Sequence, residues 1–346
     1  MKGMRVRRYN KFIVFLFISF MFFGCKSKSD YHINLHHIDL QIEINRFDQE
    51  LCLLNKINYE SQLQEIAEKY PDMFRVFVEQ LARAGKIEDS VYVDRLHTFF
   101  FDKYTQELYS DCQLKFSKLD KIEEDIENAY KHIHYYYPDQ EIPEFYSIIS
   151  NFGVAAASFE HIIMFSLDYY LGADYHYYDD LFPKYKSNRF REEYICSDIM
   201  KVQFGEIYPE EEYSGNTLLS NMIYLGKKLF FMELMLPETA DSIKVGYRKE
   251  ELKWCEKNEG KIWNQILLSN VLYETQTLKI SRYIDDGPFT NAYGIPSDSP
   301  ARLGEWLGWQ IVQKYIETKK IKNYIELFEE KDAQKILMES GYKPKP

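Results

Sequence analysis

The spacing of apolar residues is the feature that most constrains the fold of this chain. From Ile57 onward they recur every three or four positions, which places them on one face of a helix. The clearest helix ends at Pro138, and its apolar face consists of Ile122, Ile126, Tyr130, Ile133 and Tyr137. The same spacing predicts helices near residues 57–69, 72–84, 90–115, 188–206, 216–236, 248–272, 299–319 and 332–340.

The middle of the chain departs from this pattern. Phe145–Ser150 and Val154–Ser166 are apolar and compatible with strands, and Asn151-Phe152-Gly153 between them predicts a hairpin turn. A strand near Phe159–Leu167 would bring the aromatic segment Asp168–Gly172 to the sheet edge. The predicted fold class is therefore mainly α with a small embedded β-sheet, an α+β fold.

Composition supports this fold class. The chain has 15 Gly and 11 Pro among 346 residues, fewer than the turns of an all-β sandwich require. No helical repeat period and no Gly/Ser-rich linker divides the sequence. We therefore expect a single domain over residues 41–346.

The N-terminus predicts export. Five cationic residues precede a 12-residue apolar segment at 12–23, which is too short to span a bilayer comfortably, and Gly24-Cys25 follows. This pattern predicts a signal peptide over residues 1–24, although an uncleaved anchor helix is the alternative. Gly24-Cys25 resembles a bacterial lipobox, in which the cysteine thiol is acylated, with Phe22 where that pattern prefers Leu.

We therefore expect Cys25 to be lipidated and residues 25–40 to form a polar tether. Several acyl chains anchor a protein stably where one would be marginal. The tether lacks an acidic run resembling the surface-export signal of Bacteroidetes lipoproteins. The expected location is the cell envelope, anchored by lipid and facing the periplasm.

The charge balance excludes one class of partner. The chain has 43 basic and 54 acidic residues, and loss of residues 1–24 removes five of the basic ones. Nucleic-acid binding needs clustered Lys and Arg to neutralise phosphates, so we expect no nucleic-acid partner. The four remaining cysteines, Cys52, Cys112, Cys196 and Cys255, have no framework or zinc spacing. We expect buried free thiols, although export leaves disulfides open.

Common catalytic signatures are missing from the sequence. None of the eight histidines lies in an HExxH motif, and no GxSxG, GxxxxGK[ST], GxGxxG or CxxC motif occurs. Carboxylate runs such as Asp179-Asp180 and Glu210–Glu212 fit solvated surface better than acid/base pairs. The sequence thus favours a non-catalytic protein without a cofactor, and leaves open a peptidase-like or glycan-active hydrolase with an unrecognised site.

A distinctive motif lies near the C-terminus: Pro288-Phe289-Thr290, followed by Ser299-Pro300 and the helix to Val312. Ser299 as N-cap and Pro300 at the first helical position predict the helix start. Gly304 and Gly308 form a notch for another backbone, and Trp306 and Trp309 lie near one face. A tightly packed core helix is favoured over a binding helix, and the candidate structural or interaction residues are Arg302, Gly304, Trp306, Gly308 and Trp309.

Four segments in order carry a resemblance to a known family. They are Ile44–Asp48, Leu167–Gly172, Met222–Phe231 and the C-terminal motif, with Ala301 where the family usually has Gly. With its lipobox, the chain resembles the GldB family of gliding-motility lipoproteins of Bacteroidetes. The resemblance implies an envelope lipoprotein that supports gliding motility or its associated secretion machinery through contacts with unidentified envelope proteins, with no established catalytic activity.

That family is also distantly similar to zinc-dependent peptidases of the HExxH class. The comparison would place a metal site on the helices Asp198–Tyr208 and Leu218–Leu236, where this chain has no histidine pair and has Lys227-Lys228 instead. A degenerate zincin-like scaffold is therefore expected. If the hydrolase alternative held, the ligands would be sought among His132, His161, Asp198 and Glu233.

Overall fold

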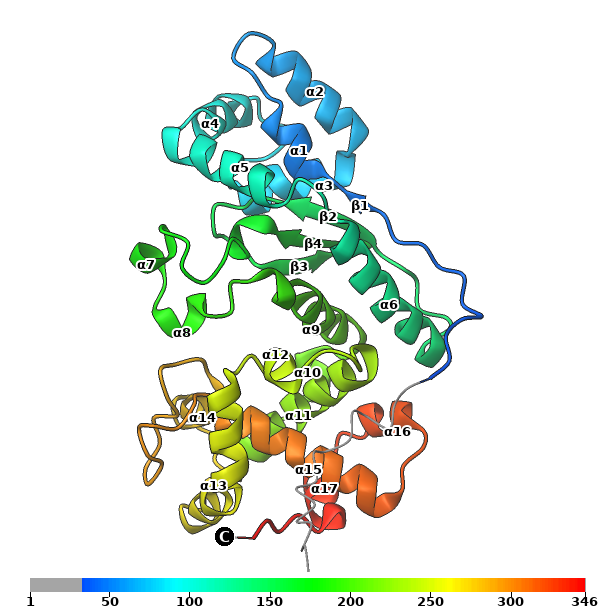
Figure 1. The fold of residues 1–346 in the computed structure, drawn as a ribbon, viewed down its shortest axis with the longest axis vertical. Helices are drawn as coiled ribbons and strands as arrows, with labels where there is room; N and C mark the ends of the chain where they lie inside the picture. The colour runs from blue at the N-terminus through cyan, green and yellow to red at the C-terminus, as the bar shows by residue number, and fades with distance from the viewer. Residues whose placement is uncertain (1–32, 346) are drawn as a thin grey trace, which may run out of the picture.

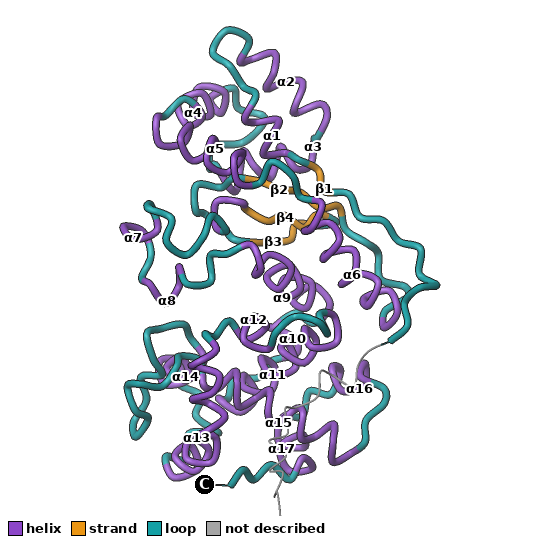
Figure 2. Tube along the Cα trace, in the orientation of Figure 1, coloured by secondary structure: helices purple, strands orange, loops and turns teal. Residues whose placement is uncertain are grey.

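The computed structural model describes residues 33–345. Most of these residues are helical, and a four-stranded sheet is embedded among the helices, which confirms the predicted fold class (Figures 1 and 2). The expected signal peptide and Cys25 lie outside the described residues. Within the described part, no helix combines the length and apolar character needed to span a membrane.

A group of short helices occupies one end of the molecule, above the sheet in Figure 1. Residues 90–115 form two helices instead of the single predicted one, because Asp102 caps a new start by accepting from the Tyr104 and Thr105 amides. A longer helix, α6, then lies along the sheet. The elements are α1 Phe47–Cys52, α2 Tyr59–Lys69, α3 Pro71–Val76, a π-helical turn Phe77–Leu81, α4 Val91–Phe100, α5 Lys103–Lys115 and α6 Asp120–Tyr136.

The sheet has the strand order β1-β2-β4-β3. β2 is parallel to β1 and β4, and β3 is antiparallel to β4. The strands are β1 Ile44–Asn45, β2 Glu144–Ile148, β3 Ala156–Phe159 and β4 Ile162–Ser166. β1 contributes only two residues to the edge, which is too short for a pattern of alternation in the sequence to predict.

The hairpin predicted at Asn151–Gly153 is wrong. The hairpin instead joins β3 to β4 through Glu160 and His161, inside the segment that the sequence suggested was one apolar strand. The 151–153 loop crosses from β2 to the far edge, and Asn151 and Phe152 both adopt left-handed backbone angles, with φ of 51° and 61°. The buried Asp168 carboxylate accepts the Phe152 amide and thereby holds this loop.

Helices make up the remainder of the described chain. The predicted helix at 188–206 begins only after a 3₁₀ turn, Glu192–Tyr194, and other predicted helices hold with small changes at their ends. The elements are α7 Tyr178–Leu181, α8 Lys184–Ser187, α9 Ile195–Ile207, α10 Glu210–Tyr213, α11 Leu218–Met235, α12 Asp241–Val245, α13 Lys249–Leu268, α14 Thr277–Ile284, α15 Leu303–Lys319, α16 Tyr324–Glu329 and α17 Ala333–Ser340.

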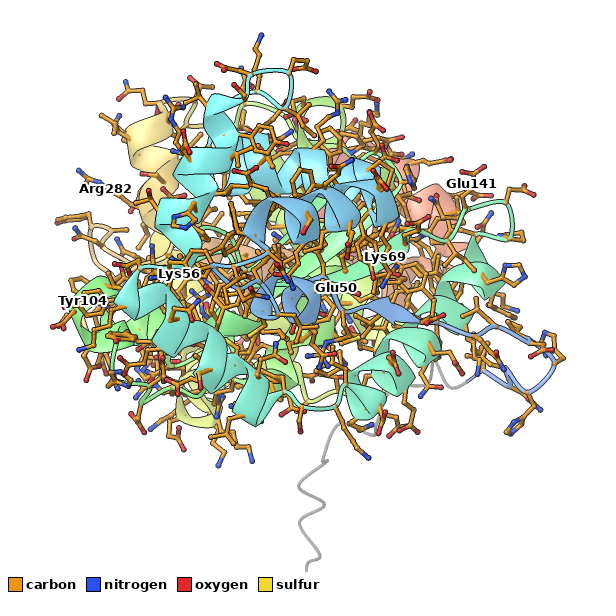
Figure 3. All side chains as sticks on the ribbon, turned by 90° about the horizontal axis from the view of Figure 1, so that it is seen from above. Glu50, Lys56, Lys69, Tyr104, Glu141 and Arg282 are labelled. Carbon is orange, nitrogen blue, oxygen red and sulfur yellow. The ribbon has the colours of Figure 1, made fainter. Side chains whose placement is uncertain are left out.

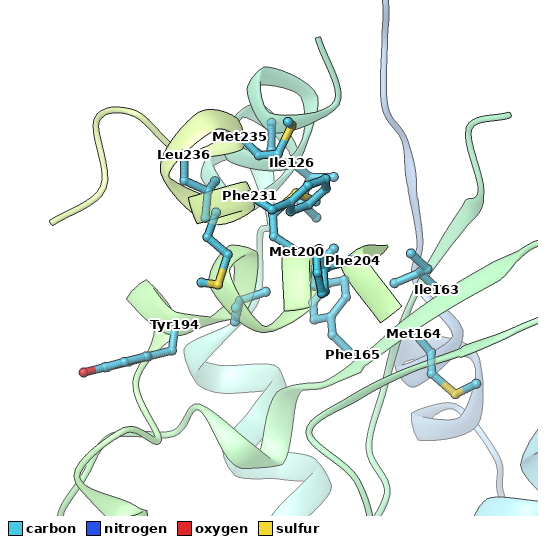
Figure 4. Close-up of a cluster of buried hydrophobic side chains, with 14 of the residues drawn as sticks. Ile126, Ile163, Met164, Phe165, Tyr194, Met200, Phe204, Phe231, Met235 and Leu236 are labelled. Carbon is cyan, nitrogen blue, oxygen red and sulfur yellow. The ribbon is translucent and has the colours of Figure 1, made fainter. Parts of the chain in front are cut away.

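Helix α9 links the sheet to the C-terminal helices. It contacts β3 and β4 on one side and α11 on the other. Figure 4 shows Met200 and Phe204 of α9 between Phe165 of β4 and Phe231 of α11, and the Phe204 and Phe231 ring centroids lie 5.4 Å apart. Buried apolar side chains from Leu40 to Ile336 form one continuous core.

The four cysteines that follow Cys25 are free thiols, as the sequence predicts. Cys112 and Cys255 are buried, whereas Cys52 and Cys196 are partly buried. Burial raises the pKa of each thiol, which keeps it protonated and unreactive. They therefore act as small apolar side chains.

Candidate functional site

Two glycines set the distance between α11 and α15, the two central C-terminal helices. A Cβ atom on Gly308 would lie 1.7 Å from the Met222 carbonyl oxygen, and one on Gly226 would lie 2.2 Å from the Gly308 carbonyl carbon. The two backbones therefore touch at this crossing. Gly304 lies one turn earlier on α15, and a Cβ atom on it would lie 3.0 Å from the Tyr283 carbonyl oxygen.

The two tryptophans of the motif are core residues. Trp306 is 1% exposed and Trp309 is 2% exposed. Trp309 donates its indole N–H to a Glu233 carboxylate oxygen at 3.0 Å, so its one polar atom is paired. The structure thus places both side chains inside the protein.

Helix α15 begins later than Ser299-Pro300 predicts. Its first residue is Leu303, whose amide donates to the Thr290 hydroxyl at 3.2 Å, and Ser299 caps nothing. The Thr290 hydroxyl in turn donates to the Pro300 carbonyl. The loop carrying Pro288-Phe289-Thr290 therefore supplies the cap from a distance in sequence, which explains why the two parts of the motif occur together.

Arg302, at the N-cap position of α15, is the centre of a buried ion-pair network. Its backbone is left-handed, with φ of 56°, and its guanidinium donates to Glu305 and to the Val245 carbonyl, the latter at 2.9 Å. The Nε atom lies 2.9 Å from an Asp286 oxygen, and the guanidinium carbon lies 5.3 Å from the Tyr247 ring centroid. Only 12% of the side chain is exposed.

The network continues on both sides of Arg302. Asp286 also accepts from Arg189, which precedes α9 in the chain, and Glu305 lies 3.6 Å from the Lys228 ammonium on α11. Five charged side chains thereby connect α11, α15, the segment after α14 and the segment after α8. We call Arg189, Lys228, Asp286, Arg302 and Glu305 the central ion-pair network.

Burial and partner charges act in opposite directions on these groups. Burial alone would raise the pKa of Glu305, but Arg302, Lys228 and Lys201 bring it below its usual value. Burial likewise opposes ionisation of Asp286, and Arg302 and Arg189 lower its pKa. Burial alone would lower the pKa of Arg302, and Glu305, Tyr247 and Asp286 raise it. Both carboxylates are therefore ionised at neutral pH and each is matched by a cation.

A cavity of about 340 Å³ adjoins the network. It lies between the segment around α8 and the segment at the start of α13, and Arg189 and Tyr247 belong both to its wall and to the cluster around Arg302. Its lining consists of Lys184, Tyr185, Asn188, Arg189, Tyr194, Gly246, Tyr247, Arg248, Glu251 and Pro288. Aromatic and cationic side chains can hold an anionic or aromatic group of a partner.

The metal ligands sought for the hydrolase alternative do not converge. His132 bonds the Asn128 carbonyl one turn earlier, and His161 lies 3.9 Å from Asp72. Asp198 pairs with Lys201 at 2.8 Å, while Glu233 accepts from Trp309 and Gln313. Within residues 33–345, the one set of three or more groups that can hold a metal is elsewhere, at Glu107, Asp111 and His176.

The two lysines of α11 have structural partners. Lys227 is buried and donates to the Phe328 carbonyl at 3.2 Å and to the Glu330 carbonyl, which fastens α11 to the end of α16. Burial lowers the pKa of Lys227 to about 8. Lys228 pairs with Glu305, and burial lowers its pKa too.

The family model described as gliding motility protein GldB matches residues 28–344. The chain belongs to the GldB family. Comparisons with curated proteins and with solved structures return no match. The matched range contains the central ion-pair network, α11, α15 and the cavity between α8 and α13.

Sequence analysis found part of this site and missed the rest. Arg302, Gly304 and Gly308 lie where the motif indicates a close helix contact, but Arg189, Asp286 and Lys228 were not assigned to an ion-pair network. One signal was present: Asp286 lies two residues before Pro288, where the C-terminal motif begins. No pattern in the sequence connects Arg189 to it.

Gly308→Ala should destabilise the protein strongly, because the new methyl group would overlap the Met222 carbonyl. We expect a loss of about 3 kcal/mol or more in the free energy of unfolding, measured by urea denaturation. Gly205→Ala in α9 is the matched control, since no atom lies within 4 Å of its ideal Cβ position. It should be stabilising by about 0.5–1 kcal/mol, and equal losses in both variants would contradict the packing described.

Lys227 should make stability depend on pH. Its pKa is about 8 in the folded protein, whereas an unfolded lysine titrates near about 10.4. Between these values the unfolded chain binds more protons, so the free energy of unfolding rises with pH across this window, by up to about 3 kcal/mol. Below the window the rise is absent, because both states are protonated.

Lys227→Met should remove the rise of the unfolding free energy with pH. Lys314 is a half-exposed lysine of α15, and Lys314→Met should leave the rise in place. Urea denaturation at intervals between pH 7.5 and about 10.5 measures it. A slope in the Lys227→Met protein equal to that of the wild type would show that another group is responsible.

Proposed function

We propose that this GldB-family protein is a lipid-anchored scaffold of the cell envelope that faces the periplasm. It supports gliding motility, or the secretion machinery associated with it, through protein contacts and without catalysis. Membership of the gliding motility family supports the link to motility. The leader, with Gly24-Cys25 at its end, supports the lipid anchor.

The observation that carries the non-catalytic proposal is the central ion-pair network. A general acid or base must reach a substrate proton, and its pKa must lie near the working pH. The Glu305 side chain is only 5% exposed, and three nearby cations lower its pKa. The Arg302 guanidinium contacts Glu305, Asp286 and the Val245 carbonyl. The two side chains pair with each other and with neighbouring charged groups of the protein, which suits a structural role.

The cavity beside the network is the proposed contact surface for an envelope partner. Its outer wall includes Lys184 and Arg248, whose side chains are 53% and 61% exposed. The deeper wall is held by Arg189 and Tyr247, which the network fixes in place. A rigid wall with an exposed polar rim is the arrangement that protein interfaces use.

Glu305→Gln separates a structural role from a catalytic one. Removal of one partner of a buried ion pair leaves the other charge uncompensated, so we expect a loss of about 3–5 kcal/mol in the free energy of unfolding. Crosslinking of the full chain to envelope proteins in living cells should decline as the folded fraction declines. A variant that keeps wild-type stability and loses motility would favour the hydrolase alternative.

Cys25→Ser tests the anchor on its own. The variant should lose labelling by radioactive palmitate and move from the membrane fraction to the soluble fraction of the envelope, because the acyl chains supply the attachment. Cys52→Ser, at a free and partly buried thiol, is the matched control and should keep both. Palmitate labelling that persists in Cys25→Ser would contradict lipidation at this residue.

A further inference from the structure

Three metal-binding side chains from distant parts of the sequence meet at the surface, and none of them belongs to the central ion-pair network. They are Glu107 and Asp111 on α5 and His176 in the loop before α7, and one donor atom from each lies within 4.8 Å of the other two. The His176 Nε2 atom lies 3.6 Å from a Glu107 carboxylate oxygen. No pattern in the sequence indicates this cluster, because 65 positions separate Asp111 from His176.

The fold brings these groups together by two independent means. Glu107 and Asp111 are four residues apart on α5, so their side chains share one face of the helix. The loop is fixed by Tyr178, whose hydroxyl donates to the buried Asp168 carbonyl and accepts the Leu171 amide. This places His176 over α5 without any contribution from a metal ion.

Aromatic contacts hold the same loop against α5. Tyr175 donates its hydroxyl to an Asp111 oxygen at 2.7 Å, and the ring centroids of Tyr177 and Tyr104 lie 6.1 Å apart. Figure 3 shows Tyr104 pointing outward at the surface. A hydrogen bond from a neighbouring side chain to a ligating carboxylate is a common feature of metal sites, because it orients the carboxylate.

The charges of the cluster favour a cation. Two carboxylates four residues apart on a helix repel each other. Across residues 33–345, no lysine or arginine forms an ion pair with Glu107 or Asp111, and the one ion-pair partner of Glu107 is His176, which is neutral when it ligates a metal. A divalent ion would cancel the two negative charges.

We propose that Glu107, Asp111 and His176 bind a divalent first-row transition-metal ion, and that the ion fastens the 170–178 loop to α5. One imidazole with two carboxylates suits zinc and manganese, and zinc should bind more tightly. Donor atoms of a tetrahedral zinc site lie about 3.4 Å apart, so the side chains must close by about 1 Å. The His176 and Glu107 side chains are 57% and 45% exposed, so both can be reached by an ion from solvent. Water completes the coordination.

Equilibrium dialysis of the full chain against zinc chloride, followed by metal analysis, tests the proposal. The wild type should bind one equivalent, and His176→Ala and Glu107→Gln should each weaken binding by more than about 10-fold. His161→Ala is the matched control, because His161 is also a half-exposed histidine facing a carboxylate, Asp72 at 3.9 Å, but lacks a third ligand. The His161→Ala protein should bind zinc as tightly as the wild type does.

Hydrogen exchange gives a second readout that does not depend on stoichiometry. Zinc should slow amide exchange in the 170–178 loop of the wild type and of His161→Ala, and should leave it unchanged in His176→Ala. Absence of zinc binding, or equal binding in the wild type and His176→Ala, would overturn the proposal. The two proposals can fail separately, because Glu107, Asp111 and His176 belong neither to the central ion-pair network nor to the cavity lining, although Lys184 of that lining contacts the loop at Ala173 and Asp174.

Discussion

The backbone contact between Gly226 and Gly308 is the constraint on which the C-terminal part of the structure depends. With no side chain between them, α11 and α15 come close enough for Glu305 on one helix to reach Lys228 on the other. The same approach sets the depth at which Arg302 enters the protein. Any larger residue at either position would separate the helices and leave buried charges without their partners.

Burying the central ion-pair network costs free energy through desolvation and backbone strain, and contacts inside the protein offset part of that cost. Arg302 adopts a left-handed backbone, which costs about 1 kcal/mol for a residue other than glycine. Its guanidinium loses water, but it gains two carboxylates, two carbonyl oxygens and an aromatic ring. Such networks contribute more to a unique arrangement than to net stability. Here the arrangement fixes one wall of the cavity between α8 and α13.

Local patterns in the sequence predicted local structure correctly. They failed where contacts between residues distant in the sequence determine the structure. Helical spacing located α6 and α13 because each buries one face along its own length. The hairpin at 151–153 was wrong because β2 pairs with β4, and Asp168, not the turn residues, holds the connecting loop. Ser299 failed as an N-cap because Thr290 caps α15 from outside the helix. The motif identified Arg302 and Gly308, but Arg189 and Asp286 reach the network only through the tertiary fold.

The central claim is that Arg302 and Glu305 hold the fold and take no part in chemistry. The most direct test is a double-mutant cycle of Arg302→Met and Glu305→Leu, with unfolding free energy and motility measured for each variant. If the pair is structural, the double variant should be less destabilised than the sum of the single variants, by about 2 kcal/mol or more, and should restore motility as it restores folding. A double variant that is as stable as the wild type but abolishes motility would contradict the claim.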